Sequence, residues 1–161
     1  MSNISRSPIR LACVVLTTWT MPLALRPALA QQILVGSVQE VEPDGTRQAG
    51  DDTPAILNVS DKVFARDIVT TSAKGRVHVQ FLDGTDLRLN PGSRVEIDEY
   101  VYDPNSGTGA RGVVTMGRGL MRWVSGNVQP NGMKFKTQAA TIGIRGTEIL
   151  LGVGADGTRK S

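Results

Sequence analysis

Residues 76–90 read Arg-Val-His-Val-Gln-Phe-Leu-Asp-Gly-Thr-Asp-Leu-Arg-Leu-Asn, two short alternating runs separated by Asp83-Gly84. Alternation of apolar and polar residues is the period of a strand with one buried face. Glycine at the second central position of the turn permits the positive φ that a tight hairpin requires. The stretch therefore predicts a β-hairpin. Its core face would carry Val77, Val79, Phe81, Leu87 and Leu89. Its outer face would carry Arg76, His78 and Gln80.

Turn-forming residues also recur along the rest of the chain. Glycine or proline recurs about every eight to twelve residues, and the apolar residues do not follow the spacing of a long amphipathic helix. Asn90-Pro91-Gly92-Ser93 predicts a second turn, since proline fixes one φ and glycine supplies the next. Val95 and Ile97 then resume the inward alternation. We therefore expect an all-β single domain of short, mostly antiparallel strands that form a sandwich, a roll or a β-solenoid-like stack.

Further strands are predicted on both sides of this region. An initial strand and the turn Pro43-Asp44-Gly45 are expected within residues 31–49. Residues 103–112 are polar and rich in glycine, which predicts a long exposed hairpin loop. The later strands are expected at residues 113–116, 120–124, 133–137 and 141–152.

Trp123 follows Met121 by two residues, so both should lie on one face of a sheet, with Phe81 or Phe135 as neighbours. The alternative for this tryptophan is a functional one, an exposed platform that binds a sugar. Only one tryptophan occurs after residue 30 and no aromatic stripe accompanies it, so packing in the core is favoured.

Residues 1–30 have the organisation of a secretory signal peptide. Arg6 and Arg10 form a positively charged start, and residues 11–25 are largely apolar. Ala28-Leu29-Ala30 provides the small residues that a signal peptidase requires. We expect cleavage before Gln31 and a periplasmic or secreted product.

Two alternatives fit this leader less well. A membrane anchor needs about 20 apolar residues, whereas Pro22, Arg26 and Pro27 interrupt the apolar run. Cys13, the only cysteine, has no apolar stretch before it, and Arg10 lies three residues upstream, where a lipid-attachment motif requires an aliphatic residue. The exported domain would then contain no disulfide and would depend on its hydrophobic core.

The full sequence has a net charge of +3, and the residues after position 30 have a net charge of zero. Three arginines are the only charged residues of positions 1–30, so 15 of the 18 Lys and Arg remain, equal to the 15 Asp and Glu. A domain without net charge has no long-range attraction for phosphate backbones or anionic lipids. We therefore expect no nucleic-acid partner and no membrane insertion after cleavage.

No catalytic centre is predicted. His78 is the only histidine and falls on the outer face of a strand, where an exposed structural residue is expected. Asp83 is explained by its turn, and Glu96 and Asp98 by the outward positions of a strand. These explanations are preferred to an acid–base pair or a calcium site. We expect no enzyme activity, no metal site and no cofactor.

The run Gly143-Ile144-Arg145-Gly146-Thr147 lacks the Gly-Lys-Ser/Thr ending of a phosphate loop. Glycines within a strand instead mark a bulge or a close backbone approach. Arg145 and Glu148 could pair and hold the closing strand, since a planar guanidinium suits a carboxylate. If the two are buried partners, loss of one would cost about 3–5 kcal/mol.

Taken together, these segments resemble the FecR family. The pieces follow the family's order at residues 57–63, 67–71, 81–89, 91–95, 118–123 and 145–148. The resemblance extends from near Gly50 to about Val153. It implies fold-defining, non-catalytic roles for Asp83, Gly84, Gly119, Trp123, Gly143, Arg145, Gly146, Thr147 and Glu148.

The resemblance also implies a compartment and an organisation. FecR proteins are best known as sensor-regulators that sit in the bacterial periplasm and relay an outer-membrane signal inward. This chain resembles only their periplasmic domain, so we expect a stand-alone secreted form. The expected parts are a signal peptide (1–30), an N-terminal strand and turn (31–49), a FecR-like β domain (50–153) and a flexible tail (154–161).

Two functional hypotheses follow. The first is a non-enzymatic periplasmic protein that acts through protein contacts in envelope or iron-uptake-type signalling, with an outer-membrane receptor or a membrane-bound regulator as its partner. The second is a secreted structural, adhesin or glycan-binding envelope module without a signalling role. Genes for a sigma factor and a TonB-dependent receptor beside this gene would favour the first.

Overall fold

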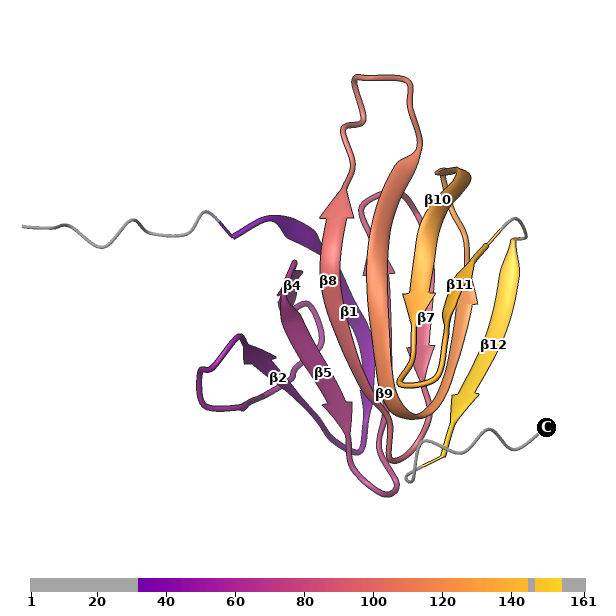
Figure 1. Cartoon of the computed structure of the whole chain (residues 1–161). Helices are drawn as coiled ribbons and strands as arrows, with labels where there is room; N and C mark the ends of the chain where they lie inside the picture. Colours follow the sequence, from indigo (N-terminus) through magenta and orange to yellow (C-terminus); the bar gives the residue numbers. More distant parts are fainter. Residues whose placement is uncertain (1–31, 145–146, 155–161) are drawn as a thin grey trace, which may run out of the picture. The chain divides into compact units, whose positions relative to one another are not determined.

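The computed structural model describes residues 32–144 and 147–154, in which the chain forms twelve β-strands and no helix (Figure 1). The strands are β1 Leu34–Glu42, β2 Gly45–Ala49, β3 Ala55–Ile56, β4 Lys62–Phe64, β5 Asp67–Thr71, β6 Arg76–Phe81, β7 Asp86–Leu89, β8 Arg94–Val101, β9 Ala110–Val124, β10 Val128–Lys136, β11 Thr141–Gly143 and β12 Glu148–Val153. The all-β prediction is confirmed. Within the described segments nothing helical could cross a bilayer. The predicted signal peptide and nearly all of the predicted tail lie outside these residues.

The strands form one curled sheet in two halves that share β9. The first half has the order β4-β1-β6-β7-β9-β12, and the second has the order β3-β2-β5-β8-β9-β10-β11. The end of β9 pairs with β7 and β12, and its beginning pairs with β8 and β10. Only the pair of β9 and β10 is parallel among these strands. The sequence left open a sandwich, a roll or a β-solenoid-like stack, and this curled sheet corresponds to the roll.

The buried side chains of both halves meet in one core. All apolar residues predicted to face inward from the hairpin are buried: Val77, Val79, Phe81, Leu87 and Leu89. Trp123 packs edge to face on Phe81 and on Phe135, with ring centroids 5.1 Å apart in both pairs. Phe81 also meets Tyr100 of β8 at 5.3 Å, so the ring contacts join the two halves. Trp123 is 1% exposed, and its predicted role in the core is confirmed.

β9 departs from the prediction. Residues 103–112 were expected to form a loop and residues 113–124 two strands, but one strand runs from Ala110 to Val124. The register with β8 shifts so that Gly117 is an extra residue, and Gly119 has a φ of 94°. A bulge bends a strand and increases its twist while pairing continues on both sides. The predicted break is therefore a bend, which lets one strand serve both halves of the sheet.

The hairpin of β6 and β7 confirms the predicted turn and corrects one side chain. Gly84 has a φ of 83° and Gly92, in the next turn, a φ of 70°. His78 lies on the outer face as predicted, but its side chain is only 16% exposed. Its Nε2 is 2.5 Å from Oδ1 of Asp86, which lies diagonally across the hairpin. The expectation of an exposed histidine is therefore wrong, since the ring is largely buried and its Nε2 contacts a carboxylate.

Residues 141–152, predicted as one strand, form two. β11 pairs with β10 and β12 pairs with β9, so the two strands belong to different halves. Between them, the amide of Ile144 donates to Met133 at 3.3 Å, and the carbonyl of Thr147 accepts from the amide of Ser125 at 2.6 Å. The prediction of a single strand over residues 141–152 is therefore wrong, because its two parts have different partners in the sheet.

Candidate functional site

Asp83 lies in a buried polar cluster at the tip of the β6–β7 hairpin. Its Oδ1 accepts a hydrogen bond from the Tyr100 hydroxyl at 3.0 Å, and its Oδ2 accepts one from the Thr85 hydroxyl at 2.7 Å. Burial, with the charge of Asp83 second, raises the pKa of Tyr100, so this hydroxyl remains a donor. The amide of Asn127 donates to the Asp83 carbonyl at 2.9 Å. The cluster fixes the hairpin against the connection between β9 and β10, which supports a structural role for Asp83.

Gly119 lies where β9 passes the turn that precedes β8. The Ser93 hydroxyl accepts from the amide of Leu120 and donates to its carbonyl, both at 3.0 Å. A Cβ added at Gly119 would lie 2.5 Å from the Cα of Ser93. Only glycine fits both this close approach and the positive φ. Gly119 therefore has a structural reason to be glycine.

Within the described residues, the motif positions near the end of the chain form no buried cluster. Gly143 and Thr147 are exposed, and Arg145 and Gly146 lie outside the described residues. Glu148 is exposed and accepts a hydrogen bond from Nε of Arg122 at 2.7 Å. Glu148 is therefore not a buried carboxylate, whereas the predicted pairing with Arg145 lies outside the described residues and stays a prediction. Its partner in the described part of the chain is Arg122, which lies diagonally across from it on β9.

Loss of the Arg122–Glu148 ion pair is expected to change stability little. Exposed pairs are screened by water and opposed by side-chain entropy. The hydrogen bond from Arg122, with its charge second, lowers the pKa of Glu148. The pair therefore contributes above the ordinary pKa of a carboxyl, and this contribution disappears as the pH falls through the lowered pKa. We expect Glu148→Gln and the exposed control Lys136→Gln to have similar urea midpoints at pH 7. A clear loss in Glu148→Gln alone would contradict this expectation.

β12 is the longest of the strands that end the two halves of the sheet. The others, β3, β4 and β11, have two or three residues. β12 has six, and in the described part of the chain it pairs only with β9. None of its residues after Glu148 is charged, and Leu150 is 66% exposed. Proteins usually protect edge strands by charge, proline or short length. After Glu148, β12 lacks this protection, and within the described residues its outer edge keeps unpaired backbone N–H and C=O groups.

An apolar hollow of about 210 Å³ lies beside this edge. It is lined by Thr137, Ala139, Ala140, Ile142, Leu151, Gly152 and Val153. Leu151 and Val153 pack against the core but stay half-buried, because no strand of the described residues covers the far side of β12. Sequence reasoning missed this edge. The signal was the run Ile149-Leu150-Leu151, whose lack of alternation makes both faces of the strand apolar.

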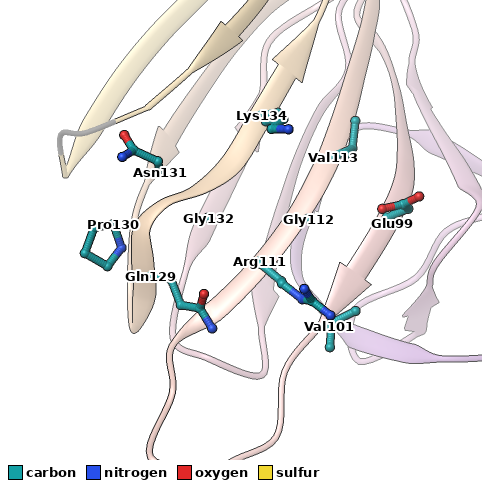
Figure 2. Close-up of a pocket in the computed structure, with 10 residues that line it drawn as sticks. All are labelled: Glu99, Val101, Arg111, Gly112, Val113, Gln129, Pro130, Asn131, Gly132 and Lys134. Atoms are coloured by element: carbon teal, nitrogen blue, oxygen red, sulfur yellow. The ribbon is translucent and has the colours of Figure 1, made fainter.

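A second hollow, of about 390 Å³, lies on the outer face of β8, β9 and β10 (Figure 2). We call it the outer groove. It is lined by Glu99, Val101, Arg111, Gly112, Val113, Gln129, Pro130, Asn131, Gly132 and Lys134. Its three charged side chains form no hydrogen bond or ion pair within the described residues. Sequence reasoning assigned part of this groove to a loop and missed it.

A bulge in β10 forms one wall of the outer groove. Val128 pairs with Ala110 and Met133 with Gly112, so four residues of β10 lie opposite a single residue of β9. Asn131, within this bulge, has a φ of 57°. A Cβ at Gly132 would lie 2.7 Å from the carbonyl oxygen of Ala110, so the bulge returns very close to β9. Bulges of this kind are typical of sheet edges and of the surroundings of binding sites, where they redirect side chains.

The described residues contain no group of three His, Cys, Asp or Glu side chains that could hold a metal ion. Comparison with known proteins gives one family. The family model described as FecR protein matches residues 67–161, which include every motif residue singled out from the sequence. The matched segment begins at residue 67, later than the expected start near Gly50. No curated protein and no solved structure matches the chain.

Proposed function

The chain belongs to the FecR protein family, and from that premise we propose that it is a non-enzymatic periplasmic protein that binds a partner protein in envelope signalling. The partner would add an extended segment to the free edge of β12. Residues 1–30 support the compartment, because they have the composition of a cleavable leader. The expected partner is an outer-membrane receptor or a membrane-bound regulator.

The observation that carries this proposal is the unprotected edge of β12. Strand addition supplies affinity through backbone hydrogen bonds and specificity through pockets for alternate side chains. The hollow beside Leu151 and Val153 provides one such apolar pocket. Side chains of an added strand would also pack beside the half-buried Leu151 and Val153 on the inner face of β12. The segment that fits is apolar and alternating, because β12 offers no charge after Glu148 for a charged segment to pair with.

Burial of Trp123 bears on the alternative function. The glycan-binding form of the alternative was based on Trp123 as an exposed platform on which a sugar could stack. Trp123 lies between Phe81 and Phe135 and is not available for this. This disfavours the glycan-binding form of the alternative and leaves protein contact as the common element of the structural and signalling forms.

Photo-crosslinking in living cells tests the proposal. A photoreactive amino acid at position 150 should give a discrete adduct with one envelope protein, whereas the same group at position 56 should not. Ile56 is a matched control because it is 74% exposed on the short edge strand β3. A synthetic peptide copied from the crosslinked segment should then bind the purified protein. Leu150→Lys should weaken that binding at least about tenfold, as expected when a charge enters an apolar contact.

The proposal fails under two results. Identical adducts from positions 150 and 56 would show that the β12 edge has no preference for a partner. Unchanged peptide binding in Leu150→Lys would show that the partner docks elsewhere. The Leu150→Lys variant should keep the melting temperature of the wild type, since the side chain projects from the outer face into water.

A further inference from the structure

The charged side chains of the outer groove have a defined spacing (Figure 2). Glu99 pairs with Val113, which pairs with Lys134, so the carboxylate and the ammonium group stand on either side of one β9 residue. With neighbouring strands about 4.8 Å apart, their Cα atoms are separated by roughly 10 Å. Arg111 lies two residues before Val113 on the same face of β9, roughly 7 Å along the strand.

These three groups are free to bind a ligand. Each is exposed, and none forms an ion pair within residues 32–144 and 147–154. The wall above them is the β10 bulge, which holds the amide side chains of Gln129 and Asn131 at the rim. A Cβ at Gly112 would overlap the Glu99 carbonyl, so the floor between β8 and β9 is closely packed. The groove thus carries one negative and two positive groups on closely paired strands.

We propose that the outer groove binds an extended peptide segment that carries a carboxylate and an ammonium group two residues apart. In an extended segment, side chains at i and i+2 lie on one face about 6.6 Å apart. That spacing is close to the diagonal distance of about 7–8 Å between residues on adjacent strands, here Glu99 and Arg111. The peptide ammonium group would meet Glu99, and its carboxylate would meet Arg111 and Lys134.

The lining disfavours two other ligand classes. A polyphosphate or another polyanion would be repelled by Glu99, which no cation of the described residues neutralises. A glycan would lack a stacking surface, because no aromatic residue lines the groove. This site belongs to the outer face of the second half of the sheet and is independent of the β12 edge, so either can fail without the other.

An NMR titration of the purified protein with four capped tripeptides tests this proposal. The peptides are acetyl-Glu-Ala-Lys-amide, its Glu→Gln form, its Lys→Gln form, and the form with both changes. The doubly charged peptide should shift the amide signals of Gly112 and Gly132 and should bind most tightly. Loss of either charge should weaken binding about three- to fivefold, the range expected for one partly exposed ion pair.

Variants of the groove give a second readout. Lys134→Gln should weaken binding of the doubly charged peptide about three- to fivefold. Lys136→Gln is the matched control, because Lys136 is exposed on the same strand two residues further along and does not line the groove. Glu99→Lys should abolish the preference for the ammonium-bearing peptide and should create binding of inorganic phosphate. All three residues are exposed, so each variant should melt at the wild-type temperature.

Several results would overturn the proposal. One is equal binding of the four peptides, or signal changes that do not involve the groove. Another is an equal loss in Lys134→Gln and Lys136→Gln. Binding of inorganic phosphate to the wild-type protein as tightly as the doubly charged peptide would show a simple anion site instead.

Discussion

Trp123→Ala is expected to lower the free energy of unfolding by about 3–5 kcal/mol, the range for truncation of a large buried aromatic residue. Trp123 is 1% exposed and packs edge to face on Phe81 and Phe135, which come from the two halves of the sheet. Its removal leaves a cavity where these halves meet. A domain of this size has a total stability of about 5–15 kcal/mol, so the variant would lose a large fraction of it. Urea unfolding followed by circular dichroism measures it.

Trp123→Phe is the matched control for this prediction. A phenyl ring keeps the edge-to-face contacts and gives up part of the volume and the hydrogen bond from Nε1 to the Ser125 hydroxyl, which is 3.1 Å long. We expect it to retain at least half of the stability that the alanine variant loses. If the alanine and phenylalanine variants unfold at the same urea concentration as the wild type, the tryptophan is not the centre of the core.

The core was predictable because it depends on local alternation. Val77, Val79 and Phe81 alternate with polar residues in the printed sequence, and each of them is buried in the sheet. The turn at Gly84 was predictable for a similar reason, since Asp-Gly between two alternating runs permits few other conformations. Both features require only neighbouring residues, so no knowledge of distant strands is needed.

The role of β9 was not predictable from local sequence. Gly117 and Gly119 have the composition of a turn, and the sequence alone does not distinguish a turn from a bend within a continuous strand. The difference is set by partners far along the chain, because β8 pairs before the bend while β7 and β12 pair after it. Tertiary pairing of this kind overrides the local tendency to end the strand.

Both candidate sites depend on the same long-range pairing. The outer groove exists because β10 runs parallel to β9 and bulges beside Arg111, and no local pattern specifies a parallel partner. The free edge of β12 exists because β11 and β12 separate into different halves. The sequence contained one usable sign, the apolar run at residues 149–151. A strand with one buried face and one solvent-exposed face would alternate apolar and polar residues there.

Three glycine variants should separate the roles of the motif glycines, with Gly119→Ala the most damaging. At Gly119 alanine meets a φ of 94° and the backbone of Ser93, 2.5 Å from the new Cβ. The strained φ costs about 1–3 kcal/mol, and the overlap adds about 1–3 kcal/mol. Gly84 has a φ of 83°, but the space around an added Cβ is open. Gly84→Ala therefore carries only the cost of the strained φ, about 1–3 kcal/mol. Gly143→Ala meets neither obstacle and should remain within about 0.5 kcal/mol of the wild type. Urea unfolding of the three proteins gives the order directly.

Two results would contradict this order. If Gly143→Ala were the most destabilised variant, the exposed glycine of β11 would have a function that its surroundings do not explain. If Gly119→Ala matched Gly84→Ala, Ser93 would be able to move away, and the bend in β9 would be less rigid than its contacts imply.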